Sequence, residues 1–281
     1  MRTRFISGFL FCIGVSLLGV NIAGFFVPLK NPDIYSGEYG YLKKRVTLTE
    51  DQLWAATLRV RNESAREYVL RLNKAVNEGI AHYWENEGAY EYNLRIPFQE
   101  NYLLFLASYI YPQQYAKYEY CDYRKAIRRG VGLCSQQAII VVGLLEAQGI
   151  NHRIAHLGGH VVALAEVDEG VWWIVDADYG VVVPHALAEV ESDPGIIKPI
   201  YKQKGYSDDI VEYLSGLYGR EHNRVYSGIR EYRFWKIYEI ERLSYVLIWI
   251  IPIMMLTPYL VLRGKGWSNR RTVSAFRHYG S

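Results

Sequence analysis

Two long uncharged runs are the strongest feature in the pattern of hydrophobic and polar positions. Residues 5–29 and 243–262 contain no charged side chain over 25 and 20 positions. About 20 apolar residues are enough for an α-helix to cross the hydrocarbon core of a bilayer, so we expect a transmembrane helix in each run. A cleaved signal peptide is the alternative for the first run, but that run is longer than a typical signal core and no small-x-small cleavage site follows it. A buried core helix is the alternative for the second run.

Between the two runs, the spacing of apolar positions predicts helices first and strands afterwards. A capping box at residues 49–52 opens a helix, and apolar positions at helical spacing predict a longer one over residues 64–84. Another helix is expected over residues 97–111, with Pro112 ending it. Residues 154–183 are rich in β-branched side chains and turn signals, which predicts successive strands. This order gives an α+β pattern rather than a βαβ alternation. The remaining expected elements are a loop at residues 31–41, a short helix from Ser207 to about Gly216 or Gly219, and a helix over residues 226–242.

Charge is distributed unevenly along the chain. The formal net charge is +3, but residues 1–4 carry +2 and residues 263–281 carry +5, which leaves −4 for residues 5–262. By the positive-inside rule, both termini are expected in the cytoplasm and the middle of the chain outside it. The acidic middle argues against nucleic-acid binding. A mean hydropathy of −0.08 excludes a transporter with many spans, and three cysteines exclude a small disulfide-stapled fold.

Cys134 is the candidate nucleophile because of its place at the start of a helix. Residues 134–148 are apolar on nearly every side, which is typical of a buried central helix, and Gly149 is expected to end it. The unpaired N–H groups and the positive end of the dipole at the start of a helix favour a thiolate. The same N–H groups could stabilise an oxyanion on an attacked carbonyl.

His160 is the candidate base, because a nucleophilic cysteine needs a base and a group that orients it. His160 begins one apolar run, the turn at residues 168–170 follows, and a second apolar run ends at Asp176. A three-residue hairpin loop places His160 opposite Asp178, with Asp176 on the same face of the sheet. A two-residue loop would reverse this parity. With the three-residue loop, either carboxylate could orient the histidine.

Four short motifs follow one another between residues 126 and 184: Gly132-x-Cys134-x-x-x-Ala138, Ala147-x-Gly149-Ile150-x-x-Arg153, His160, and Trp173-x-x-Asp176. Together they resemble the bacterial transglutaminase-like superfamily, a branch of the papain-like enzymes. The resemblance implies a papain/transglutaminase-like α+β core, with a buried helix that begins at the cysteine and packs on an antiparallel sheet. It implies that Cys134 is the nucleophile, His160 the general base and acid, and Asp176 the orienting group. No metal or organic cofactor is implied.

Other interpretations of these residues stay open. No side-chain oxyanion donor is evident just before Cys134, and Tyr118, Tyr120 and Tyr123 are candidates by proximity alone. Cys134 could instead be a small buried side chain, or could form a disulfide with Cys121 in an oxidising compartment.

A metal site is a further alternative. His152, His156 and His160 are spaced by four, which on a continuous helix could form a metal-binding face. The glycines at 158 and 159 argue against such a helix.

The favoured function is a membrane-anchored, extracytoplasmic thiol enzyme acting on an amide or peptide bond. The acyl group would pass to water, as in a peptidase or amidase, or to an amine, as in a transglutaminase. The expected location is the bacterial inner membrane, with two spans and a periplasmic main domain. Expected partners are a peptide, protein or amide substrate, membrane lipid and other envelope membrane proteins. The alternative is a catalytically inactive binding or scaffold subunit of an envelope or polysaccharide-related assembly.

The expected segments are a cytoplasmic tip (1–4), a first transmembrane helix (5–29), an extracytoplasmic helical region (30–96), a transglutaminase-like core (97–200), a second helical region (201–242), a second transmembrane helix (243–262) and a basic cytoplasmic tail (263–281).

Overall fold

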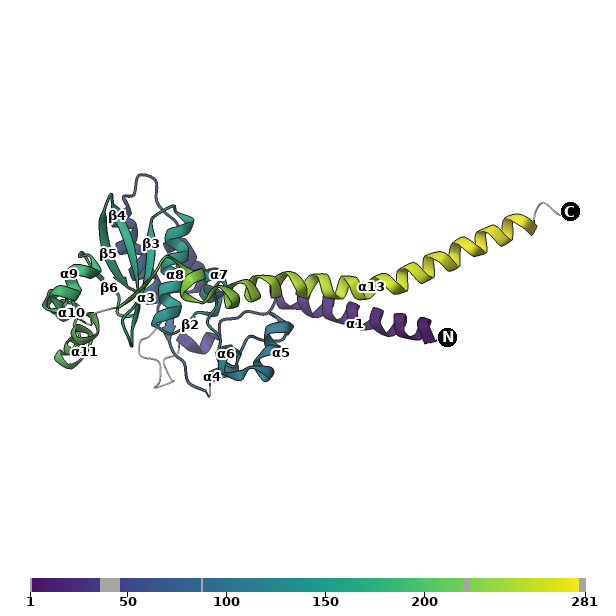
Figure 1. Cartoon of the computed structure of the whole chain (residues 1–281), viewed down its shortest axis with the longest axis horizontal. Coiled ribbons are helices and arrows are strands. Elements are labelled where there is room, and N and C mark those ends of the chain that lie inside the picture. The colour runs from purple at the N-terminus through teal and green to yellow at the C-terminus, as the bar shows by residue number, and fades with distance from the viewer. Residues whose placement is uncertain (1, 36–45, 87, 220–222, 278–281) are drawn as a thin grey trace.

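Helices α1 (Arg2–Gly24) and α13 (Trp235–Arg277) lie side by side and extend from one end of an α+β body (Figure 1). The computed structural model describes residues 2–35, 46–86, 88–219 and 223–277, so part of the expected loop at 31–41 lies outside the described residues. Each long helix contains a stretch long and apolar enough to cross a membrane, Phe5–Gly24 and Trp235–Arg263. Both uncharged runs are therefore largely helical. The first helix ends at Gly24 instead of residue 29, and a 3-10 turn, η1 (Pro32–Tyr35), follows.

The expected helix over residues 226–242 is divided into three elements. These are β7 (Arg224–Tyr226), α12 (Ile229–Tyr232) and the first turns of α13. Phe234 has a φ of 60°, which interrupts the helical backbone between α12 and α13.

Two prolines lie inside α13, and the carbonyl that each one frees has a partner. Proline has no N–H, so Pro252 leaves the carbonyl of Ile248 without its helical donor. That carbonyl accepts hydrogen bonds from Asn21 Nδ2 at 2.6 Å and from the Tyr102 hydroxyl at 3.1 Å. Pro258 frees the carbonyl of Met254 in the same way, and Thr257 Oγ1 donates to it at 2.6 Å. Because both carbonyls are satisfied, the helix continues through both prolines.

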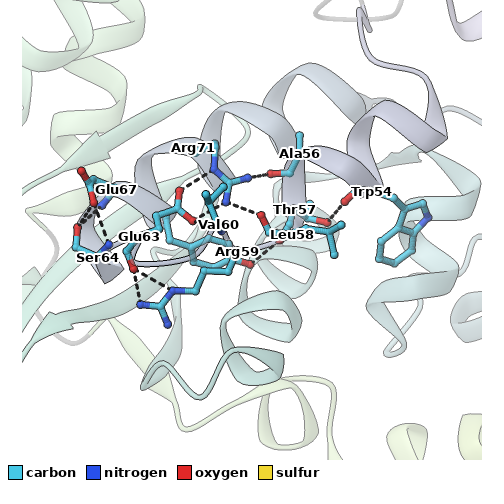
Figure 2. A network of polar contacts seen from close by, with 11 residues as sticks. Trp54, Ala56, Thr57, Leu58, Arg59, Val60, Glu63, Ser64, Glu67 and Arg71 are labelled. Carbon is cyan, nitrogen blue, oxygen red and sulfur yellow. Dashed lines mark hydrogen bonds and ion pairs between the residues drawn. The ribbon is translucent and has the colours of Figure 1, made fainter.

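A pair of capped helices precedes the core. Helices α2 (Glu50–Thr57) and α3 (Ala65–Gly79) both begin with a capping box, the first of which the sequence predicts. The Arg71 side chain joins the two helices (Figure 2): it pairs with the Glu63 carboxylate at 2.7 Å and donates to the carbonyls of Ala56 and Leu58 at the end of α2. These are carbonyls that a helix end leaves unpaired. Helix α3 stops at Gly79 rather than at residue 84, because the chain enters strand β1 (Ala81–His82).

The expected helix over residues 97–111 is shorter than predicted. Helix α5 (Tyr102–Ile110) begins after Asn101, whose side chain caps the N–H groups of residues 103 and 104. Pro112 is the first residue of the next helix, α6 (Pro112–Tyr115), rather than only a stop. Proline is tolerated at this position because the first N–H of a helix has no helical partner. The neighbouring helices are α4 (Gly88–Glu91) and α7 (Tyr123–Arg129).

A buried helix and a five-stranded sheet form the centre of the body. Helix α8 (Cys134–Ala147) follows the short strand β2 (Val131–Gly132), which pairs in parallel with β1. The sheet has the strand order β6-β5-β4-β3-β7, and all its pairs are antiparallel. Its other strands are β3 (His152–His156), β4 (Val161–Asp168), β5 (Val171–Asp176) and β6 (Val181–Val183).

The β4–β5 hairpin has a shorter loop than expected but the predicted register beyond it. Asp168 pairs with Val171, so the loop has two residues instead of three, with Gly170 left-handed at a φ of 73°. A bulge between Glu166 and Asp168 restores the register, and Ala163 pairs with Val175. A bulge places one extra residue in a strand, which compensates for the residue missing from the loop.

Helices cover both faces of the sheet. Alternate residues of β4 divide between two cores: Ala163 and Ala165 pack with α8 and α3, whereas Val162 and Leu164 pack with the helices that follow β6. Those helices are α9 (Leu187–Ser192), the 3-10 turn η2 (Pro194–Ile196), α10 (Ile197–Gln203) and α11 (Asp208–Tyr218). Figure 1 shows α9, α10 and α11 on the side of the sheet away from α8.

Candidate functional site

Cys134 is the first residue of α8, as the sequence predicts. Gly130 ends α7 in the left-handed conformation, with a φ of 72°, and β2 then directs the chain into α8. The residue before the helix is Leu133, whose apolar side chain cannot accept a hydrogen bond from the first N–H groups. The half-buried Cys134 thiol therefore lies at an end of the helix where backbone donors and the dipole favour negative charge.

The structure brings Cys134, His160 and Asp176 together. His160 lies just before β4, and Asp176 is the last residue of β5. His160 Nε2 is 2.8 Å from Asp176 Oδ2, and Cys134 lies near enough to His160 to contribute to raising the pKa of the imidazole. The histidine is almost wholly buried, and the carboxylate is fully buried. Since Nε2 faces the carboxylate, Nδ1 is left for the thiol.

The charge of Asp176 determines the protonation of His160. Burial by itself lowers the pKa of the imidazole, but the negative charge and hydrogen bond of Asp176, helped by the contact with Cys134, raise that pKa well above 6.5. The arrangement therefore makes the His160 imidazole a stronger base than a free histidine.

Tyrosines from α10 and α11 extend this chain of hydrogen bonds. The Tyr201 hydroxyl donates to Asp176 Oδ2 at 2.6 Å, and the Tyr218 hydroxyl lies 3.1 Å from that of Tyr201. Burial, reinforced by the charge of Asp176, raises the pKa of both phenols well above 10, so Tyr201 keeps the proton that it donates. The ring of Tyr179 meets the His160 ring edge-on, with centroids 5.3 Å apart. The sequence shows no motif that marks these tyrosines among its 25.

Asp178 contacts a second histidine instead of His160. Its Oδ1 atom lies 2.7 Å from His82 Nδ1 and 2.7 Å from Gln137 Nε2. The carbonyl of Asp178 also accepts from Asn77 Nδ2 at 3.0 Å. Strand β1, helix α3 and the first turn of α8 thus hold the turn after Asp176. The sequence analysis missed His82 and Gln137, which lie 96 and 41 residues from Asp178 along the chain.

Two of the tyrosines proposed as oxyanion donors face other parts of the protein. The Tyr118 hydroxyl donates to Glu241 Oε2 at 2.8 Å. The Tyr123 ring packs against Gly143, nine residues along α8 from Cys134, which is about 13 Å on a helix. Tyr120 is buried, with its ring 4.8 Å from the Arg129 guanidinium. The backbone N–H groups at the start of α8 remain as candidate donors.

An acidic group lies beside the residue that follows Cys134. The Ser135 hydroxyl donates to Glu119, and Arg233 Nη1 pairs with the same carboxylate at 3.1 Å. Glu119 and Arg233 also line an open cavity of about 570 Å³, together with Arg95 and Lys117. The cavity therefore reaches the carboxylate that Ser135 contacts, and its lining has more basic than acidic groups.

The alternatives for the cysteines and histidines are not formed. All three cysteines are free thiols, so no bond joins Cys121 to Cys134. Burial raises the pKa of Cys121, which keeps that thiol protonated. His152 and His156 lie at the two ends of strand β3 and not on a helix, about 13 Å apart. Among the described residues, no group of three or more His, Cys, Asp or Glu side chains could hold a metal ion.

Comparison with protein-family models, with curated proteins and with solved structures found no match to this chain.

Proposed function

We propose that this protein is a membrane-anchored, extracytoplasmic thiol enzyme that acts on an amide or peptide bond. The observation that carries the proposal is the His160–Asp176 pair, 2.8 Å apart, beside Cys134 at the start of α8. A nucleophile, a base and a group that orients the base are the parts that covalent acyl transfer requires. We assign the core to the papain/transglutaminase-like fold, because a buried helix begins at the cysteine and packs on an antiparallel sheet that carries the histidine and the acid.

The reaction follows from the positions of these groups. His160 takes the thiol proton, and Cys134 Sγ attacks the carbonyl carbon, whose oxygen becomes negative. The N–H groups at the start of α8 are placed to stabilise that oxyanion. The C–N bond then breaks as His160 returns the proton to the leaving amine, which leaves a thioester on Cys134. Water or a second amine attacks the thioester, His160 accepts a proton from the attacking group and returns it to the sulfur, and the thiol is regenerated.

Anchoring in the membrane is part of the same proposal. We propose that α1 and α13 cross the bacterial inner membrane, because both contain uncharged stretches of sufficient length. The basic residues before the first stretch and after the second favour cytoplasmic termini. The body between them would then lie in the periplasm.

Alkylation of Cys134 by iodoacetamide tests the assembled triad. We expect labelling at pH 5.5, located by peptide mass spectrometry, and at least a tenfold lower rate in His160→Ala. The matched control is His156→Ala, which removes a partly exposed histidine from β3. Equal labelling of the wild type and His160→Ala would contradict the proposal and favour an inactive binding or scaffold subunit. Incubation with a glutamine peptide and a primary amine then distinguishes hydrolysis from amine transfer by the mass of the product.

A further inference from the structure

Helix α5 has an exposed apolar face, and we infer that this face lies in the interfacial layer of the bilayer that α1 and α13 cross. Leu106, Tyr109 and Ile110 follow the i, i+3, i+4 spacing of one helix face, and Ile110 is 68% exposed. Tyr111 is exposed directly after them. Contiguous exposed apolar surface of this kind marks a binding site for a partner or a membrane. The inference rests on the proposed membrane anchoring and is independent of the thiol chemistry.

The composition around α5 fits lipid better than water. Residues 101–116 contain no charged side chain. The nearest acid before them, Glu100, is buried, pairs with Lys125 and accepts a hydrogen bond from the Tyr245 hydroxyl at 2.9 Å. Tyrosines such as Tyr109 and Tyr111 are favoured where apolar and aqueous layers meet.

Contacts with the two long helices fix the depth of α5. Asn101 Nδ2 donates to Ser244 Oγ at 2.9 Å, and the Tyr102 hydroxyl donates to the Ile248 carbonyl at 3.1 Å. Gly24, at the end of α1, approaches the backbone of Gln99 so closely that a Cβ atom there would overlap the Gln99 carbonyl oxygen. Ile248 is five positions into the uncharged run of α13, which is about 7 Å along a helix. Helices that lie in a membrane interface are buried by about 5–10 Å, so α5 begins at a matching depth.

The arrangement of the aromatic rings supports the same placement. Phe98 packs edge-on against Phe105 at 5.5 Å, and Phe105 packs edge-on against Tyr109 at 5.2 Å. Figure 1 shows α5 at the end of the body from which α1 and α13 extend. The lipid surface next to those two helices is therefore the occupant that we assign to this face. It would hold the body, and Cys134 with it, against the membrane.

The connection between α2 and α3 provides a matched control. Val60 is 61% exposed, almost as much as Ile110, but it lies between Arg59 and Arg61. An apolar side chain between two charges is ordinary soluble surface. The positive control is Ile253, which is exposed on the apolar part of α13.

Photo-crosslinking in a lipid bilayer tests the inference. The photoreactive residue p-benzoylphenylalanine is placed singly at position 110, 60 or 253 of the full chain, in nanodiscs of phosphatidylethanolamine and phosphatidylglycerol. Lipid adducts are then measured by mass spectrometry. We expect adducts at positions 110 and 253, with at least a tenfold lower yield at position 60.

The three positions separate the ways in which the inference can fail. Adducts at position 253 without adducts at 110, or equal yields at 110 and 60, would overturn the placement of α5 and leave the membrane anchor intact. A crosslink from position 110 to a protein in native membranes, without lipid adducts, would assign the face to a protein partner instead. No adduct at position 253 would overturn the proposed membrane anchor and this inference with it. Iodoacetamide labelling of Cys134 tests the proposed chemistry separately.

Discussion

Replacing Asp176 by asparagine should reverse the pH dependence that His160 gives to the stability of the body. Burial lowers the pKa of His160, but the nearby Asp176 charge outweighs burial and raises the pKa well above 6.5. A histidine in the unfolded chain titrates near pH 6.5. Above that pH the folded protein keeps a proton that the unfolded chain has released. The free energy of unfolding therefore decreases as pH rises from about 6.5 toward the folded pKa.

The expected slope follows from this single proton. One proton held by the folded state alone changes the free energy of unfolding by about 1.4 kcal/mol per pH unit. The measurement needs a Cys134→Ala background. A thiolate–imidazolium pair holds as many protons as a neutral thiol and a neutral imidazole, so proton transfer between Cys134 and His160 would not change the number of protons that the folded protein binds. With the thiol removed, Asp176 is the group that still raises the pKa of His160 through a direct contact.

Guanidinium unfolding in detergent micelles at pH 7.0, 7.5 and 8.0 measures this slope. We expect the free energy of unfolding of Cys134→Ala to fall by about 1.4 kcal/mol per pH unit relative to Cys134→Ala/Asp176→Asn. In the double variant burial still lowers the pKa of His160, so its stability should instead decrease as the pH falls below about 6.5. Parallel curves for the two proteins would refute the assignment of Asp176 as the charge partner of His160.

Three further changes test other parts of the structure. Tyr201→Phe removes a buried hydrogen bond to a carboxylate and should lower the free energy of unfolding by about 1.5–3 kcal/mol in chemical denaturation, whereas Tyr206→Phe, which removes a bond to a carbonyl, should cost about 1 kcal/mol. Equal losses would contradict a charged acceptor. Asn21→Leu and Tyr102→Phe should each lower the free energy of unfolding by about 0.6 kcal/mol in the same measurement. The double variant should lose more than the sum of the two, because the Ile248 carbonyl, which Pro252 frees, then has neither donor. A phosphatase that is active only outside the cytoplasm should be silent when fused after Ser281, and activity there would overturn the two-span topology.

The elements that the sequence predicts best depend on local composition. The uncharged runs identify α1 and α13, and the apolar run over residues 138–145 identifies α8, because both signals extend over many residues. Helix α3 was predicted too long for a related reason. Ile80 and Trp84, which follow the end of the helix, are also apolar, so helical spacing continues by chance beyond Gly79.

The β4–β5 register shows how local rules can give the correct result through a wrong intermediate step. The predicted three-residue loop is wrong, yet the residues beyond it pair as expected, because the two-residue loop and the bulge after Glu166 offset each other. A bulge depends on packing against the rest of the sheet, which no local turn signal reports. The contacts of Tyr201 and His82 depend in the same way on chain segments that meet only in the folded protein.

Strand periodicity alone does not decide which of Asp176 and Asp178 contacts His160. Alternation along a strand places residues two apart on one face, which left Asp178 as an alternative to Asp176 for orienting His160. Strand β5 ends at Asp176, however, so Asp178 lies in the turn beyond it and is free of that alternation. There His82 and Gln137 both contact its Oδ1 atom, while Asp176 keeps the register that points its carboxylate at His160. Because strand β5 ends at Asp176, the two acids contact different histidines. The bond from Gln137 to Asp178 also ties the first turn of α8 to the turn that follows the orienting acid.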